Sequence, residues 1–125
     1  MFENEVSRHI VDAAFRIHTT LGPGLFESVY QVTLEYELNK QSFDRQKPIP
    51  VVYETIRLEK GFRADFIVED KVIVELKSVE VTASIHRKQL LTYLRLADKR
   101  LGLLINFNVS LIKDGISRVV NALPE

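Results

Sequence analysis

The sequence contains no cysteine and carries no excess charge of either sign. Without cysteine, the chain forms no disulfides and no thiolate zinc sites, and it has no Cys nucleophile. The 17 basic and 17 acidic residues give a net charge of zero, which counts against a protein that binds polyanions through its overall electrostatic field. A local basic groove hidden by acidic residues elsewhere remains compatible with this balance.

The sequence also lacks long hydrophobic runs, repeats and linkers. No apolar run approaches the about 20 residues that a membrane-spanning helix needs, and the N-terminus has no basic segment followed by an apolar core. We therefore expect a soluble, unexported, cytoplasmic protein without membrane contact. At 125 residues, 46% of them hydrophobic, the chain is long enough for one domain and too short for two, so we expect a single domain over residues 1–125.

Glycine and proline are few, and they mark the boundaries of predicted helices and strands. Apolar residues at helical spacing predict helices over residues 5–21 and 26–41, and Gly22-Pro23-Gly24 between them stops the first helix. Residues 43–58 contain Pro48 and Pro50, which predict an extended strand at a sheet edge or with a bulge.

The second half of the chain alternates strands with one helix. The pattern predicts a hairpin of strands 64–68 and 72–76, a helix from Thr82 or Ser84 to about residue 98, a buried strand over 101–107, and a weak hairpin around Asp114-Gly115. The resulting order, α-α-β-β-β-α-β, predicts an α/β (α+β) fold with a mixed central sheet and helices packed against it.

Asp65 and Glu75 lie in the two strands of the predicted hairpin. A three-residue loop would place them directly opposite each other, whereas a two-residue loop would place Asp65 opposite Val74. Like charges paired across strands are destabilising by up to about 1 kcal/mol, so something should compensate them. A Mg²⁺ or Mn²⁺ ion bound by both carboxylates would do so. Lys77, on the same strand face as Glu75, would then hold or activate a water.

The same residues also allow an ordinary structural interpretation. Asp65, Glu75 and Lys77 can form a solvated charge patch on the outer face of a hairpin, and so short a pattern recurs by chance. Glu27, in the first turn of a helix, complements the helix dipole. His86 is equally explained as a solvent-facing or capping histidine.

Two further segments carry polar residues at helical spacing. In GPGLFESVY, Glu27 and Tyr30 lie three residues apart on one side of a helix. In IHRKQLLTYL, a polar stripe runs along a helix whose other face is leucine-rich. The members of that stripe are His86, Gln89 and Tyr93. The side chains expected to line a substrate are Tyr30, His86 and Tyr93.

Taken together, these residues resemble the GxxExxY family, a branch of the PD-(D/E)XK nuclease-like superfamily. Gly24-x-x-Glu27-x-x-Tyr30 matches the motif for which the family is named, and the resemblance continues through RADFIVEDKVIVELKSVE, HRKQLLTYL and LGLLINF. Ala64 stands where the superfamily's name expects proline. The resemblance implies a restriction-endonuclease-like αβββαβ core with a mixed central sheet flanked by helices.

The resemblance also implies roles for individual residues. Asp65, Glu75 and the main-chain carbonyl of Leu76 would bind Mg²⁺ or Mn²⁺, and Glu27 would be a further acidic ligand or orient a water. Lys77 would position the attacking water or stabilise the pentavalent phosphorane. The implied reaction is metal-dependent hydrolysis of phosphodiester bonds in DNA, or in RNA. With Gln89 lining the site from its helix, the implied catalytic set is Glu27, Asp65, Glu75, Lys77 and Gln89.

Two other functions are compatible with the sequence. The neutral net charge and the absence of an added DNA-gripping domain favour a catalytically inactive module that uses the nuclease fold to bind nucleic acid or a protein partner. A homodimer would instead build a binding groove from two copies, because 125 residues offer little surface to wrap a duplex. The nuclease is the leading prediction, because the complete set of implied catalytic residues is present.

Overall fold

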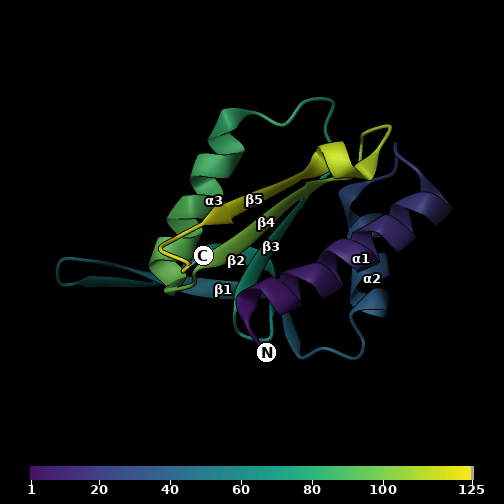
Figure 1. Ribbon diagram of the computed structural model, residues 1–125. Helices are drawn as coiled ribbons and strands as arrows, with labels where there is room; N and C mark the ends of the chain where they lie inside the picture. Colours follow the sequence, from purple (N-terminus) through teal and green to yellow (C-terminus); the bar gives the residue numbers. More distant parts are fainter. Residues whose placement is uncertain (125) are drawn as a thin grey trace.

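A computed structural model of the chain describes residues 1–124 as three layers, with a five-stranded sheet between two helices on one face and one helix on the other (Figure 1). The helices are α1 (Glu3–Leu21), α2 (Glu27–Glu37) and α3 (Ser84–Ala97). The strands are β1 (Phe43–Tyr53), β2 (Ile56–Val68), β3 (Val72–Lys77), β4 (Leu101–Asn106) and β5 (Ile116–Val120), and the 3-10 helix η1 (Ile112–Gly115) precedes β5. The strands lie in chain order. Only β3 and β4 are parallel neighbours, which confirms the predicted mixed sheet flanked by helices.

The central strands are apolar on both faces because both faces are covered. Val72, Val74 and Leu76 pack under α1 and α2, whereas Ile73 faces α3, as the alternation of the sequence predicts. All six residues of β4 are buried, which is typical of a strand with helices on both sides. No helix within residues 1–124 is both long enough and apolar enough to cross a membrane.

Of the two loop lengths that the sequence allows between β2 and β3, the structure has the three-residue loop. Val68 pairs with Val72, and the ladder continues to Phe66 opposite Val74. The N–H of Lys71 donates to the carbonyl of Val68 at 3.0 Å and closes the turn. The alternative two-residue loop, which would have shifted the two strands by one position, is therefore excluded.

Tyr30 fixes the tight connection between α1 and α2. Its hydroxyl donates to the carbonyl of Gly22 at 2.7 Å and accepts from the N–H of Leu25 at 3.2 Å. Its ring is fully buried and stacks on Phe107, with centroids 4.3 Å apart. Gly22 and Gly24 take positive φ angles of 72° and 97°, a conformation that suits glycine. The expected substrate-lining role of Tyr30 does not fit this burial, because the side chain is a core and loop-closing residue.

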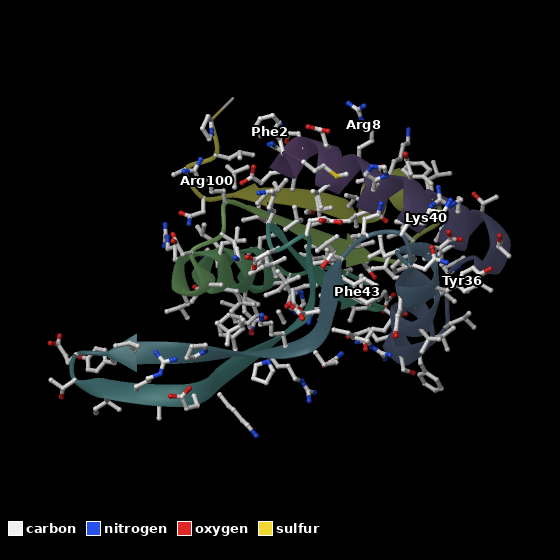
Figure 2. The ribbon with its side chains drawn as sticks, turned by 90° about the horizontal axis from the view of Figure 1, so that it is seen from below. Phe2, Arg8, Tyr36, Lys40, Phe43 and Arg100 are labelled. Carbon is white, nitrogen blue, oxygen red and sulfur yellow. The ribbon has the colours of Figure 1, made fainter. Side chains whose placement is uncertain are left out.

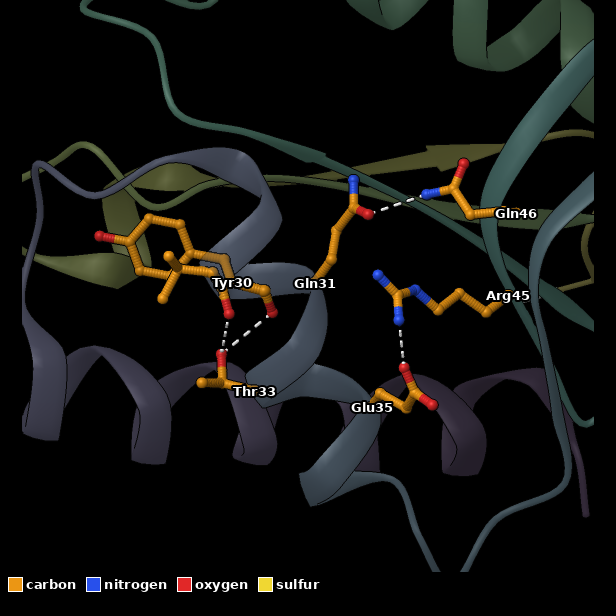
Figure 3. A network of polar contacts seen from close by, with 7 residues as sticks. Tyr30, Gln31, Thr33, Glu35, Arg45 and Gln46 are labelled. Atoms are coloured by element: carbon orange, nitrogen blue, oxygen red, sulfur yellow. Dashed lines mark hydrogen bonds and ion pairs between the residues drawn. The ribbon is translucent and has the colours of Figure 1, made fainter.

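Two side-chain pairs hold α2 against β1 (Figure 3). The Gln46 side chain donates to that of Gln31 at 2.8 Å, and Arg45 forms an ion pair with Glu35. Gln46 has a φ of 55° and interrupts the β1–β2 ladder opposite Asp65. The helix that begins with Glu27 is thus anchored to β1, the strand that pairs with the one that carries Asp65.

Two predicted segments differ from the structure. Residues 43–58, predicted as one strand, contain a turn at Glu54-Thr55 between β1 and β2, although the predicted edge position and a ladder irregularity between Ile49 and Val51 are both observed. The predicted hairpin around Asp114-Gly115 is wrong. That segment forms η1, and the apolar residues after it pair with β4, the preceding strand, across the longer connection formed by residues 107–115.

The β1–β2 hairpin extends beyond the rest of the protein as a two-stranded arm, which we define as residues 51–60 (Figure 2). The ladder breaks where the arm leaves the body, because residues 59–61 lie opposite Pro50 alone. Gly61 is needed at this break, since a Cβ there would collide with the Val51 side chain. The arm therefore leaves the sheet at a defined, closely packed bulge.

Candidate metal and catalytic site

Asp65 and Glu75 meet across the β2–β3 hairpin, on the face of the sheet that α3 covers. An Asp65 carboxylate oxygen, Oδ2, accepts the N–H of Leu76 at 2.9 Å, and Glu75 Oε1 accepts the N–H of Asp65 at 3.4 Å. The two carboxyl groups are close enough for the charge of Asp65 to act on the ionisation of Glu75. The two side chains therefore face each other, as a three-residue loop predicts.

The ionisation of Glu75 is strongly perturbed. Its burial and, next in size, the negative charge of Asp65 raise the pKa of Glu75 from 4.5 to about 9. The charge of Lys77 acts in the opposite direction and is a smaller effect. At neutral pH Glu75 consequently holds a proton, which a divalent cation would displace on binding.

Three more of the predicted site residues surround this pair. Lys77 is close enough for its charge to act on Glu75. Tyr93 reaches in from α3, and its partial burial, followed by the charges of Glu75 and Asp65, raises the pKa of its hydroxyl. Gln89, one turn earlier on α3, acts on the Tyr93 hydroxyl in the opposite direction and lowers its pKa by a smaller amount. Residues far apart in the chain thus converge on one side of the sheet.

Phe62 is a positioning residue that the sequence analysis did not single out. Its ring stacks on that of Tyr93, with centroids 3.9 Å apart and planes within 8° of parallel. The stack fixes the tyrosine ring between β2 and α3. No sequence signal identifies such a pair, because the register of α3 over the sheet is set by tertiary packing.

Asn106, at the end of β4, organises the segment that links β3 to α3. The side chain is 2% exposed. Its Oδ1 accepts the N–H groups of Val79 and Asn108, both at 3.1 Å, and its Nδ2 donates to the carbonyl of Val79 at 2.9 Å. A sequence signal does exist here, since Asn106 is the one polar residue in the buried run at 101–107. It holds the chain directly after Lys77.

Replacement of Asn106 by Ala is expected to lower the free energy of unfolding by about 2 kcal/mol, because it leaves partly buried backbone groups of Val79 and Asn108 without partners. Urea unfolding measures this difference. Asn39→Ala, at an exposed turn position, is the matched control and should change stability by less than about 0.5 kcal/mol. Equal effects of the two variants would show that the segment after Lys77 is held by other contacts.

Glu27 begins α2, as the helix-dipole interpretation expects. Ser78 Oγ donates to the carbonyl of Leu25 at 2.6 Å, and this bond brings the start of α2 to the end of β3, beside Lys77. Within residues 1–124, however, no three His, Asp or Glu side chains are grouped closely enough to hold a metal ion. Glu27 is thus near the end of β3 without forming a three-residue cluster with the Asp65–Glu75 pair.

His86 acts at the N-terminus of α3. Its Nδ1 accepts the N–H of Ala83 at 3.2 Å, which is the contact expected of a capping histidine. The predicted caps Thr82 and Ser84 do not serve, because the helix begins after Ala83 and no cap side chain bonds to its first turn. The contact that the structure gives His86 is therefore with the helix backbone.

The chemistry of the Asp65–Glu75 pair fits a hard divalent cation. Mg²⁺ and Mn²⁺ prefer oxygen ligands and are commonly held by one or two carboxylates, with water and phosphate in the other positions. The backbone of Leu76, whose carbonyl is an expected ligand, lies beside the pair through its N–H bond to Asp65. Glu75, Asp65 and Leu76 are therefore the residues that could hold such an ion.

Comparison with known proteins bears on the same region. A family model described as the PD-(D/E)XK nuclease superfamily matches residues 4–119. No curated protein and no solved structure matches the chain significantly. The matched range includes all the candidate site residues described above.

Proposed function

Because the chain belongs to the PD-(D/E)XK nuclease superfamily, we propose that it hydrolyses phosphodiester bonds in nucleic acid, with DNA the first candidate and RNA the second, using Mg²⁺ or Mn²⁺. The observation that carries the proposal is the facing of Asp65 and Glu75 on a partly buried surface, where burial and the charge of Asp65 raise the pKa of Glu75. A bound cation would offset the negative charge of such a pair, and Lys77 lies close enough for its charge to act on Glu75.

Each side chain has a role in this proposal. Asp65 and Glu75 would hold the metal ion, which when bound favours ionisation of water and offsets charge on the phosphate. The ammonium group of Lys77 would donate a hydrogen bond to the attacking water and stabilise the negative charge that develops on the phosphate. Gln89 and Tyr93 would orient the phosphate from α3, as their positions beside the carboxyl groups permit.

The direct test is incubation of the protein with single- and double-stranded DNA and RNA in Mg²⁺, in Mn²⁺ and in EDTA. Cleavage is expected with at least one of the metals and none in EDTA. Asp65→Asn, prepared in parallel, should be inactive because it removes one anionic ligand, and it also controls for contaminating nucleases.

Two results would contradict the proposal. The first is an absence of cleavage of every nucleic acid with either metal. The second is an Asp65→Asn protein that cleaves as fast as the wild type. Salt-dependent nucleic-acid binding that is unchanged by Glu75→Gln, in a protein that does not cleave, would instead identify a catalytically inactive binding module.

A further inference from the structure

The arm presents an apolar face to solvent. Val51 pairs with Leu58 and Tyr53 with Ile56, so these four side chains lie on the same face of the ribbon. Tyr53 is 70% exposed, Ile56 57% and Leu58 56%. The pair between them, Val52 with Arg57, points to the opposite face. The face that carries Tyr53, Ile56 and Leu58 therefore exposes more apolar side chains than the face that carries Val52.

The rest of the same protein molecule does not cover this face. The arm extends away from the three layers, and residues 52–60 are all exposed (Figure 2). An isolated two-stranded ribbon is only marginally stable in water, since neither strand has a further partner. Packing of the apolar face against another surface would remove it from water and stabilise the arm.

The charges on the arm favour a second copy of the chain over nucleic acid. Glu54 and Glu59 balance Arg57 and Lys60, and Arg57 is already paired with Glu59 at 2.6 Å. No excess of positive charge is available for a phosphate backbone. A face that is apolar and has no net charge is, in contrast, complementary to a copy of itself, as a two-fold symmetric contact requires.

The partner would approach through the face of the arm and not along its edge. β1 is the outer strand of the sheet, and Pro48 and Pro50 near the base of the arm lack the N–H groups that an added strand would bond to. Growth of the sheet by strand addition is interrupted there. The apolar face has no such obstacle.

We propose that the arm is a self-association element, in which the face formed by Val51, Tyr53, Ile56 and Leu58 packs against the same face of a second copy. This inference does not depend on nuclease activity. The face is small compared with the roughly 800 Å² per partner of a stable interface, so a reversible dimer of micromolar affinity is expected.

The test compares wild type with Leu58→Lys and with Val52→Lys by sedimentation velocity at about 1–200 µM protein, a range that brackets a micromolar Kd. The two substituted side chains are matched in exposure, 56% and 58%, but lie on opposite faces of the arm. Wild type should change from monomer to dimer across this range. Leu58→Lys should weaken the dimer at least about tenfold, and Val52→Lys by less than about twofold, because only the first places a charge in the contact.

Thermal unfolding of both variants at low concentration should match that of wild type, because the arm lies outside both buried clusters. A wild type that is monomeric at every concentration would overturn the proposal. Equal weakening by both substitutions would overturn the assignment of the face. A monomeric wild type whose nucleic-acid binding is lost in Leu58→Lys would assign the arm to nucleic acid instead.

Discussion

Lys77→Ala is expected to lower the rate of Mn²⁺-dependent cleavage by at least about 100-fold. The reason is that the variant loses the positive group placed beside the Asp65–Glu75 pair, and removal of one donor to the charge of a transition state costs about 10²–10³ in rate. The loss should appear in kcat more than in KM, because developing charge is stabilised more strongly than substrate. Single-turnover cleavage of a labelled oligonucleotide measures the effect.

Lys71→Ala is the matched control for this experiment. Lys71 lies in the loop before β3, at the opposite end of that strand from Lys77. The Lys71→Ala variant should therefore cleave at a rate within about twofold of wild type. If Lys77→Ala cleaves as fast as Lys71→Ala, the lysine does not assist the reaction. A loss seen equally in both variants would indicate that general positive charge, and not a positioned ammonium group, is what the substrate requires.

Glu75→Gln is expected to raise the free energy of unfolding at pH 8, in the absence of metal, by about 3 kcal/mol. The cause is the raised pKa of Glu75 in the folded protein, about 9 against an ordinary 4.5. Such a group contributes stability fully below pH 4.5, and that contribution is lost as the pH rises towards 9. Glutamine has no proton to lose, so the advantage of the variant should grow from pH 5 to pH 8.

Mn²⁺ should reverse this order. The ion would stabilise wild type by about 4.1 kcal/mol at 1,000 times its Kd, which exceeds the advantage of the variant, and it should have little effect on Glu75→Gln, which has lost one of the two anionic ligands. Glu80→Gln, at an exposed position after β3, is the control and should respond to pH and Mn²⁺ as wild type does. Thermal unfolding with and without Mn²⁺ measures all three proteins. A Glu75→Gln protein that is less stable than wild type at pH 8, with no Mn²⁺ response in either, would mean that Glu75 belongs to a structural charge network.

The β2–β3 hairpin was predictable because its determinants are local. The polar loop between two apolar runs allowed two registers, and the three-residue loop, which is the one observed, is the one that brings Asp65 and Glu75 together. Strand geometry thus predicted that these carboxylates could meet. The site roles of Asp65, Glu75 and Lys77 were implied by the resemblance to the nuclease superfamily. Gln89 and Tyr93 were recognised as one stripe of a helix, but their approach to the carboxyl groups required the position of α3 over the sheet.

Other features depend on contacts that local turn signals do not specify. The segment at 116–120 pairs with β4, a choice that local turn residues do not specify. The sequence did not predict the arm, because the prolines of β1 indicate an interrupted single strand and not the base of a long hairpin. Tyr30 and His86 carry polar atoms that suggest a site. Each of them instead satisfies backbone groups at a helix boundary.

The bonds of Tyr30 to the loop between α1 and α2 bear on how the spacing Gly24-x-x-Glu27-x-x-Tyr30 is interpreted in other sequences. In this chain its glycine supplies a turn and its tyrosine locks that turn into the core, so both ends of the motif serve architecture. A protein that had lost its chemistry would keep these two residues for the sake of its fold. The glycine and the tyrosine of this spacing are thus explained by the fold alone, whereas the proposed cleavage depends on the carboxylate pair and Lys77.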